Sequence, residues 1–183
     1  LKALTTGACN IAIGSYAADA VTTGTENIAM GTNAFGAATI GTYNTVIGYG
    51  AMSGVTTGQA DSNVAVGRGA LLGVAGTSGN CNIAIGTSTM QALTTGANNI
   101  ALGSNSADAL TTGTDNIALG RNALGAATNT SRNIAIGCGS LAGTVNDGYE
   151  NIAIGGGAMG GGDTDGDDNI AIGRLTMDAI TSG

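Results

Sequence analysis

The chain repeats one pentapeptide, Asn-Ile-Ala-Ile-Gly with small variations, ten times along its 183 residues. Successive copies start 17 to 19 residues apart. A unit this short cannot bury a hydrophobic core alone, so neighbouring units must stack and bury it together. The repeat predicts a solenoid, with residues 1–183 as a single repeat array. The Asn that opens each copy is Asn10, Asn27, Asn44, Asn63, Asn82, Asn99, Asn116, Asn133, Asn151 and Asn169.

Composition excludes several classes of protein. Aromatic residues make up only 3 % of the chain, so the core must consist of aliphatic side chains and Met. The net charge of −7 is unsuited to nucleic acid, whose phosphates require Lys and Arg. No apolar run approaches the roughly 18 residues of a membrane span. There is no His and no Gly-x-Ser-x-Gly motif, so we do not expect an enzyme.

The pentapeptide has the pattern of a short strand. Alternate residues of a strand share a face, so Ile11 and Ile13 point the same way, and their β-branched side chains favour a strand over a helix. We interpret this Ile face as the core face. Parallel stacking at about 4.8 Å would give ten rungs a length of roughly 45–50 Å. The predicted fold is all-β, a parallel β-solenoid or β-roll of about ten coils, each of 17–19 residues.

The second half of each unit fits two structures. Its apolar residues, such as Ala17, Ala18, Ala20 and Val21, are spaced for a turn of helix as well as for a second strand or extended coil. We favour the extended form. A solenoid with one strand and one helical turn per coil is the alternative. In either form, we expect the Leu, Met or Phe of this segment to fill the interior, as at Phe35 and Met90.

The central residue of the pentapeptide is Ala in nine of ten copies, with Val46 as the exception. A small apolar residue here predicts that the second strand face is also buried, as in parallel sheets. Its partner is another side of the same coil or an adjacent subunit, and we favour the adjacent subunit. The predicted subunit contacts are therefore Ala12, Ala29, Ala65, Ala84, Ala101, Ala118, Ala135, Ala153 and Ala171.

Two further positions of the pentapeptide hold the same residue in every copy, and we call the set of equivalent residues at one position a column. Stacked Asn side chains can form a hydrogen-bonded ladder along the fibre, or each Asn can satisfy the backbone of its own turn. The Gly that closes each pentapeptide, from Gly14 to Gly173, predicts a positive φ or a close backbone approach at a corner. None of these columns points to catalysis.

The consensus N-[IT]-A-[IL]-G-x-x-A-L-x-x-x-T-T-G, best matched by residues 82–96 and 99–113, resembles the seventeen-residue repeats of bacteriophage tail fibres. Its A-I-G core also resembles the head repeats of trimeric autotransporter adhesins, which have a shorter period. The resemblance implies a homotrimeric β-helical shaft on a virion or cell surface. Such a shaft holds a receptor-binding tip away from the body, so receptor contact would lie outside this chain.

Two other functions fit the repeats. One is a self-assembling extracellular filament of arrays joined end to end. The other is an ice- or surface-binding solenoid that uses the Thr-Thr pairs, as at Thr22 and Thr111. Both ends of the sequence match the second half of a repeat, so we expect the chain to be an excerpt of a longer fibrous protein.

One acidic segment is a candidate metal site. Asp163, Asp165, Asp167 and Asp168 lie among Gly residues, and their oxygens could hold a hard cation such as Ca²⁺. A solvated acidic loop is the alternative. We expect no other cofactor.

The three cysteines are not spaced for bridges within the chain. Cys9 and Cys81 occupy the same column four rungs apart, roughly 19 Å at the strand spacing. A disulfide spans at most about 7 Å between Cα atoms. Cys138 lies in another column, so only bridges between subunits remain open.

Overall fold

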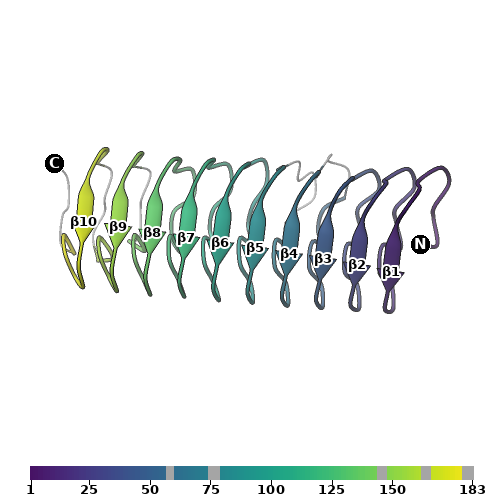
Figure 1. The fold of residues 1–183 in the computed structure, drawn as a ribbon, viewed down its shortest axis with the longest axis horizontal. Coiled ribbons are helices and arrows are strands. Elements are labelled where there is room, and N and C mark those ends of the chain that lie inside the picture. Colours follow the sequence, from purple (N-terminus) through teal and green to yellow (C-terminus); the bar gives the residue numbers. More distant parts are fainter. Residues whose placement is uncertain (57–59, 74–78, 144–147, 162–165, 179–183) are drawn as a thin grey trace.

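The computed structural model describes residues 1–56, 60–73, 79–143, 148–161 and 166–178. They form a straight rod of stacked coils, with the N-terminus and the C-terminus at opposite ends (Figure 1). One ten-stranded parallel sheet runs along the rod, with its strands in sequence order. The predicted parallel β-solenoid is confirmed. The strands are β1 (Ile11–Ile13), β2 (Ile28–Met30), β3 (Thr45–Ile47), β4 (Val64–Val66), β5 (Ile83–Ile85), β6 (Ile100–Leu102), β7 (Ile117–Leu119), β8 (Ile134–Ile136), β9 (Ile152–Ile154) and β10 (Ile170–Ile172).

Each strand pairs in register with the next, so equivalent residues stack along the rod. Between β5 and β6, for example, Ala84 pairs with Ala101. The register also holds across the two 19-residue coils that lead from β3 to β4 and from β4 to β5. The extra residues of these coils are therefore absorbed outside the strands.

Where the structure describes it, the second half of the coil consists of turns and bends, and the described residues contain no helix. The alternative with a helical turn per coil is therefore wrong. These turns are still hydrogen-bonded along the rod: the Ala18 N–H donates to the Ala34 carbonyl at 2.9 Å, and the Thr22 N–H donates to the Thr39 carbonyl at 2.9 Å. Such bonds satisfy backbone groups that burial would otherwise leave without partners. Both halves of the coil thus tie each rung to the next.

The interior of the rod is filled from the turn segments, as predicted. The largest side chains inside belong to one column, which includes Phe35, Met52, Leu71 and Met90, each no more than 2 % exposed. They pack with the Ala at the centre of each strand into one continuous cluster. The core is therefore narrow, with large side chains on one wall and Ala on the other.

The Gly at the end of each strand has both predicted properties. Gly103 has a φ of +134°, which residues with a side chain rarely adopt, and a Cβ there would lie 2.6 Å from the Gly120 carbonyl oxygen. The next coil lies directly against this corner. Because the coils are in register, the same conflict would arise at each equivalent Gly from Gly14 to Gly155, and only Gly173 at the last strand is free of it.

We expect Gly103→Ala to lower the free energy of unfolding by about 3 kcal/mol or more, since it combines backbone strain with a backbone clash. Gly139→Ala is the matched control, because Gly139 also has a positive φ (+67°) but has nothing within 4 Å of the added Cβ. The control should lose only about 1–2 kcal/mol. Chemical denaturation measures both values, and equal losses would contradict the role of the close approach.

Candidate interaction surface

The Asn residues form a ladder along the inside of one corner. The Asn99 side-chain amide donates to the Asn82 Oδ1 at 3.1 Å, and the Asn116 side-chain amide donates to the Asn99 Oδ1 at 2.9 Å. Each Oδ1 also accepts the backbone N–H of the next Asn, as between Asn116 and Asn99 at 3.0 Å. The ladder predicted from the sequence is therefore present.

The same Asn side chains also satisfy turn backbone, but mostly in the next coil and not in their own turn as the second interpretation had it; among the described residues, Asn133 also donates to the Ser131 carbonyl of its own turn at 3.1 Å. The Asn99 amide donates to the Gly113 carbonyl at 2.8 Å, and the Asn27 amide donates to the Gly41 carbonyl at 2.8 Å. The eight Asn residues from Asn27 to Asn151 are at most 1 % exposed. A polar side chain this buried is stable only when its donors and acceptors are paired. The Asn column is structural.

The Ala column lies inside the coil, and its predicted role in subunit contacts is wrong. Ala84, Ala101, Ala118, Ala135 and Ala153 are at most 1 % exposed in a single chain. Of the two partners considered for this face, the correct one is the other side of the same coil. The column is restricted to small residues because the large side chains of the turn segment occupy the space opposite.

The Ile columns, interpreted from the sequence as the core face, lie on the outside. None of their side chains is buried, and Ile85 and Leu102, far from either end of the rod, are 36 % and 48 % exposed. Nineteen of the twenty residues are apolar, with Thr45 as the exception. We call this surface the Ile face; it consists of Ile11, Ile13, Ile28, Met30, Thr45, Ile47, Val64, Val66, Ile83, Ile85, Ile100, Leu102, Ile117, Leu119, Ile134, Ile136, Ile152, Ile154, Ile170 and Ile172.

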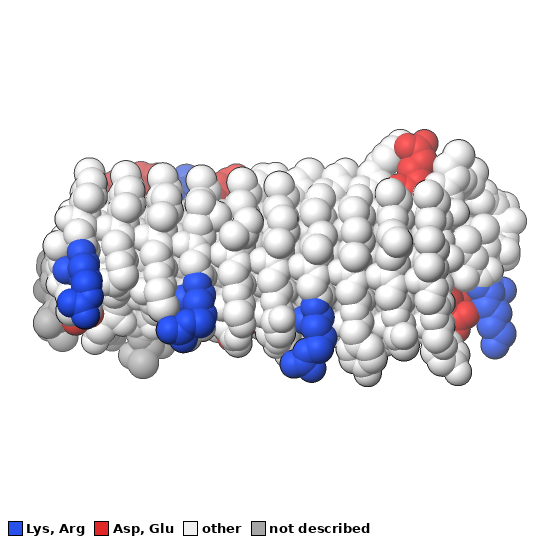
Figure 2. Space-filling view, turned by 60° about the horizontal axis from the view of Figure 1, so that its bottom comes forward, with Lys and Arg blue, Asp and Glu red and all other residues white. Residues whose placement is uncertain are grey.

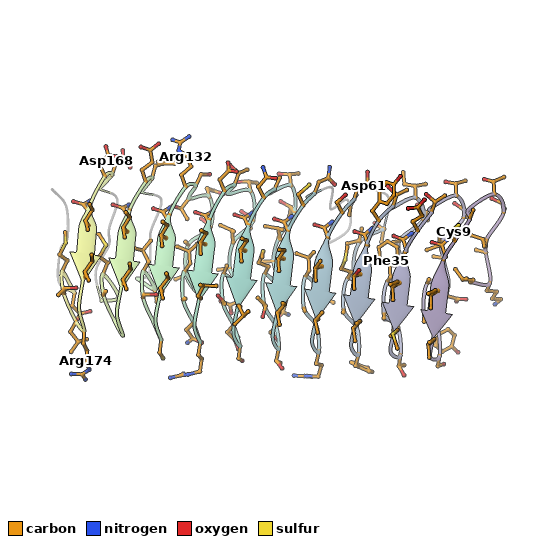
Figure 3. The ribbon with its side chains drawn as sticks, in the orientation of Figure 1. Cys9, Phe35, Asp61, Arg132, Asp168 and Arg174 are labelled. Atoms are coloured by element: carbon orange, nitrogen blue, oxygen red, sulfur yellow. The ribbon has the colours of Figure 1, made fainter. Side chains whose placement is uncertain are left out.

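Charged residues flank the Ile face on its two long edges. Arg68, Arg121 and Arg174 are exposed directly after the Gly that follows a strand, at the edge where strands end. In Figure 2, the basic side chains stand apart along the lower edge of a surface that is otherwise almost free of charge. Figure 3 places Arg174 at this edge and Asp61 and Asp168 at the opposite edge, where strands begin.

Within the described part of the chain, only Arg132 and Glu150 form an ion pair, with the Arg132 Nε 2.6 Å from the Glu150 Oε1. Both residues lie just before a strand, on the edge that carries Asp61 and Asp168, which we call the acidic edge; the basic edge is the one that carries Arg68, Arg121 and Arg174. The Arg121 guanidinium donates to the Cys138 Sγ at 3.1 Å. The basic edge therefore has no carboxylate partner among these residues.

The calcium prediction falls partly outside the described residues, because Asp163 and Asp165 are not among them. Asp167 and Asp168 are exposed, and the Asp167 Oδ1 accepts the Tyr149 N–H at 2.7 Å. Elsewhere in the described ranges, no three His, Cys, Asp or Glu side chains are grouped as a metal site requires. The calcium site remains a prediction.

The cysteines lie on the two edges of the Ile face, Cys9 and Cys81 where strands begin and Cys138 where a strand ends, whereas the Thr pairs lie in the turn half of the coil. Cys9, Cys81 and Cys138 are exposed free thiols. The first Thr of each pair lies in the turn half, and its hydroxyl donates along the rod, as from Thr22 to the Thr39 carbonyl at 3.0 Å. These hydroxyls stabilise the stack and do not form a free flat array.

Comparison with known protein families, curated proteins and solved structures finds no match. The function must therefore be inferred from the structure of the chain and from its sequence. The described residues include no helix that is both long and apolar enough to cross a membrane.

A charged side chain should have different effects on the two faces of a strand. Ala101→Glu should prevent folding of the central coils, because it places a carboxylate in the core at a cost of several kcal/mol. Leu102→Glu, one residue away on the Ile face, should keep the native circular dichroism spectrum and lose at most about 1 kcal/mol. A folded Ala101→Glu variant would contradict the observed orientation of the strands.

For the ladder, we expect Asn99→Leu to cost about 3 kcal/mol or more, since it leaves the buried Gly113 carbonyl and Asn116 N–H without partners. Asn169→Leu is the control, because Asn169 lies at the last rung and is partly exposed, and the Asn151 Oδ1 to which its side chain donates still accepts the backbone N–H of residue 169. It should cost about 1 kcal/mol. Urea unfolding monitored by circular dichroism compares the two variants, and a neutral Asn99→Leu would show that the ladder contributes nothing.

Proposed function

We propose that this chain is a segment of the rigid shaft of a surface fibre, belonging to a viral tail fibre or a cell-surface adhesin. Several copies associate side by side through their Ile faces. The resemblance to tail-fibre repeats makes the assembly a homotrimer that holds a receptor-binding tip outside this chain. The fibre is exposed on a virion or in the extracellular space.

The observation that carries the proposal is the Ile face, which extends over all ten strands. Ten rungs at about 4.8 Å and a three-residue width of about 10 Å give an area of roughly 450 Å². Monomeric proteins rarely leave larger apolar patches exposed, and patches of this size often mark an interface. Since a typical stable interface buries about 800 Å² per partner, the flanking edges must contribute as well.

The rod also has the mechanical properties that a shaft needs. Backbone hydrogen bonds, the Asn ladder and the Thr hydroxyls join each coil to the next along the long axis. Bending the rod would stretch these bonds on one side of many coils at once. A repeat array of this kind contacts only its nearest neighbours, so its length can vary without altering the coil.

The proposal is tested by the oligomeric state of the chain and of the variant Ile100→Glu with Leu102→Glu. Wild-type protein should be a discrete oligomer by light scattering at several concentrations, and the variant should associate at least tenfold more weakly. Burying four or more extra carboxylates per assembly opposes association. The control is Thr23→Glu with Thr95→Glu, which adds the same charge at exposed turn positions.

A folded, monomeric wild-type chain at high concentration would overturn the proposal. If the mass of the assembly instead rises without limit as the concentration increases, the chain forms the end-to-end filament. Loss of association in the Thr control would show that net charge, and not the Ile face, governs assembly.

A further inference from the structure

The charges on the two edges of the Ile face occur on the same rungs. The three arginines of the basic edge follow β4, β7 and β10, and are therefore three rungs apart. Each of these strands is also preceded by an aspartate on the acidic edge, Asp115 and Arg121 flanking β7 and Asp168 and Arg174 flanking β10. At β4, Arg68 again follows the strand, but Asp61 lies one position earlier in its coil than Asp115 and Asp168 do, and its Oδ1 accepts the Thr42 N–H at 2.8 Å.

These pairs cannot form within one chain. Asp115 and Arg121 lie at opposite ends of a strand segment, and six extended residues span on the order of 15–20 Å. The Asp115 and Asp168 side chains are exposed, as are those of Arg121 and Arg174. Figure 3 shows Asp168 and Arg174 at opposite edges of the same rung. The rungs of β7 and β10 thus each present an acid at one edge and a base at the other.

The direction of a neighbouring copy decides which charges meet. Suppose that the copies are related by rotation about an axis parallel to the rod. Their rods then run parallel, and the start of a strand in one copy adjoins the end of the same strand in its neighbour. The acidic edge then meets the basic edge at equal height. If the rods run antiparallel, arginines meet arginines and aspartates meet aspartates. Like charges placed together weaken association and exclude that arrangement.

We propose that neighbouring copies of this chain associate with parallel rods and level rungs, and that Arg121 and Arg174 of one copy pair with Asp115 and Asp168 of the next, at β7 and β10. This inference rests on the proposed function, because it requires assembly through the Ile face. It adds the direction and the axial register of the chains. The apolar face supplies attraction without a fixed axial position, and the charged rungs at β7 and β10 fix that position.

Charge reversal tests the arrangement. The acid variant, Asp115→Arg with Asp168→Arg, should associate about tenfold more weakly than wild type by sedimentation equilibrium at low salt, because arginines then face arginines. It also makes the net charge less negative, which alone would favour association. The base variant, Arg121→Asp with Arg174→Asp, should be weakened similarly. Combining all four substitutions should restore association to within about threefold of wild type.

Glu26→Arg is the matched control. Glu26 lies on the same acidic edge, but its strand β2 is followed by Thr32 and not by a base. Its association should stay within about threefold of wild type. Circular dichroism confirms the fold of every variant, and restoration in the combined variant excludes simple misfolding.

Failure of the combined variant to recover, with an oligomeric wild type, would overturn this arrangement and leave the proposed shaft intact. If Glu26→Arg weakened association as much as the acid variant does, that result would also overturn the arrangement. The effect would then not depend on an arginine at the same rung of the neighbouring copy. A monomeric wild type would overturn the proposed function and this inference together.

Discussion

Axial hydrogen bonding in register is the constraint on which the rest of the structure depends. Each coil is too short to satisfy its own backbone, so its N–H and C=O groups pair with the coils on either side. This pairing fixes equivalent residues above one another. A residue that is suitable at one rung is then suitable at all of them, which is why Asn, Gly and Ala recur in columns.

The architecture was predictable because it depends on period and strand pattern alone. The orientation of the strands was not. Alternation places Ile11 and Ile13 on one face and Ala12 on the other, but alternation does not state which face is inside. The usual assumption that larger apolar residues are buried gave the wrong answer here. The turn segment already supplies the large core side chains, such as Phe35 and Met90, and leaves space only for Ala.

One signal in the sequence pointed to the observed orientation. The residue at the centre of the strand is almost invariably small, whereas the outer positions accept Ile, Val, Leu, Met and Thr. A position that accepts several shapes is less tightly packed than one that accepts a single small shape. The outer positions therefore have more room than a narrow core would give them. The charge pairs on the two edges depend on which residues share a rung and on which strand face is outside, and the second of these follows only from the structure.

The two 19-residue coils show how this fold accommodates change in length. β3, β4 and β5 remain in register although their connections are two residues longer than the common 17. An insertion between strands is thus a local event, and it leaves the strands above and below in place. This makes the rod a natural display scaffold: peptides grafted at such turns would project at a height set by the rung number, and evolution could vary them one coil at a time.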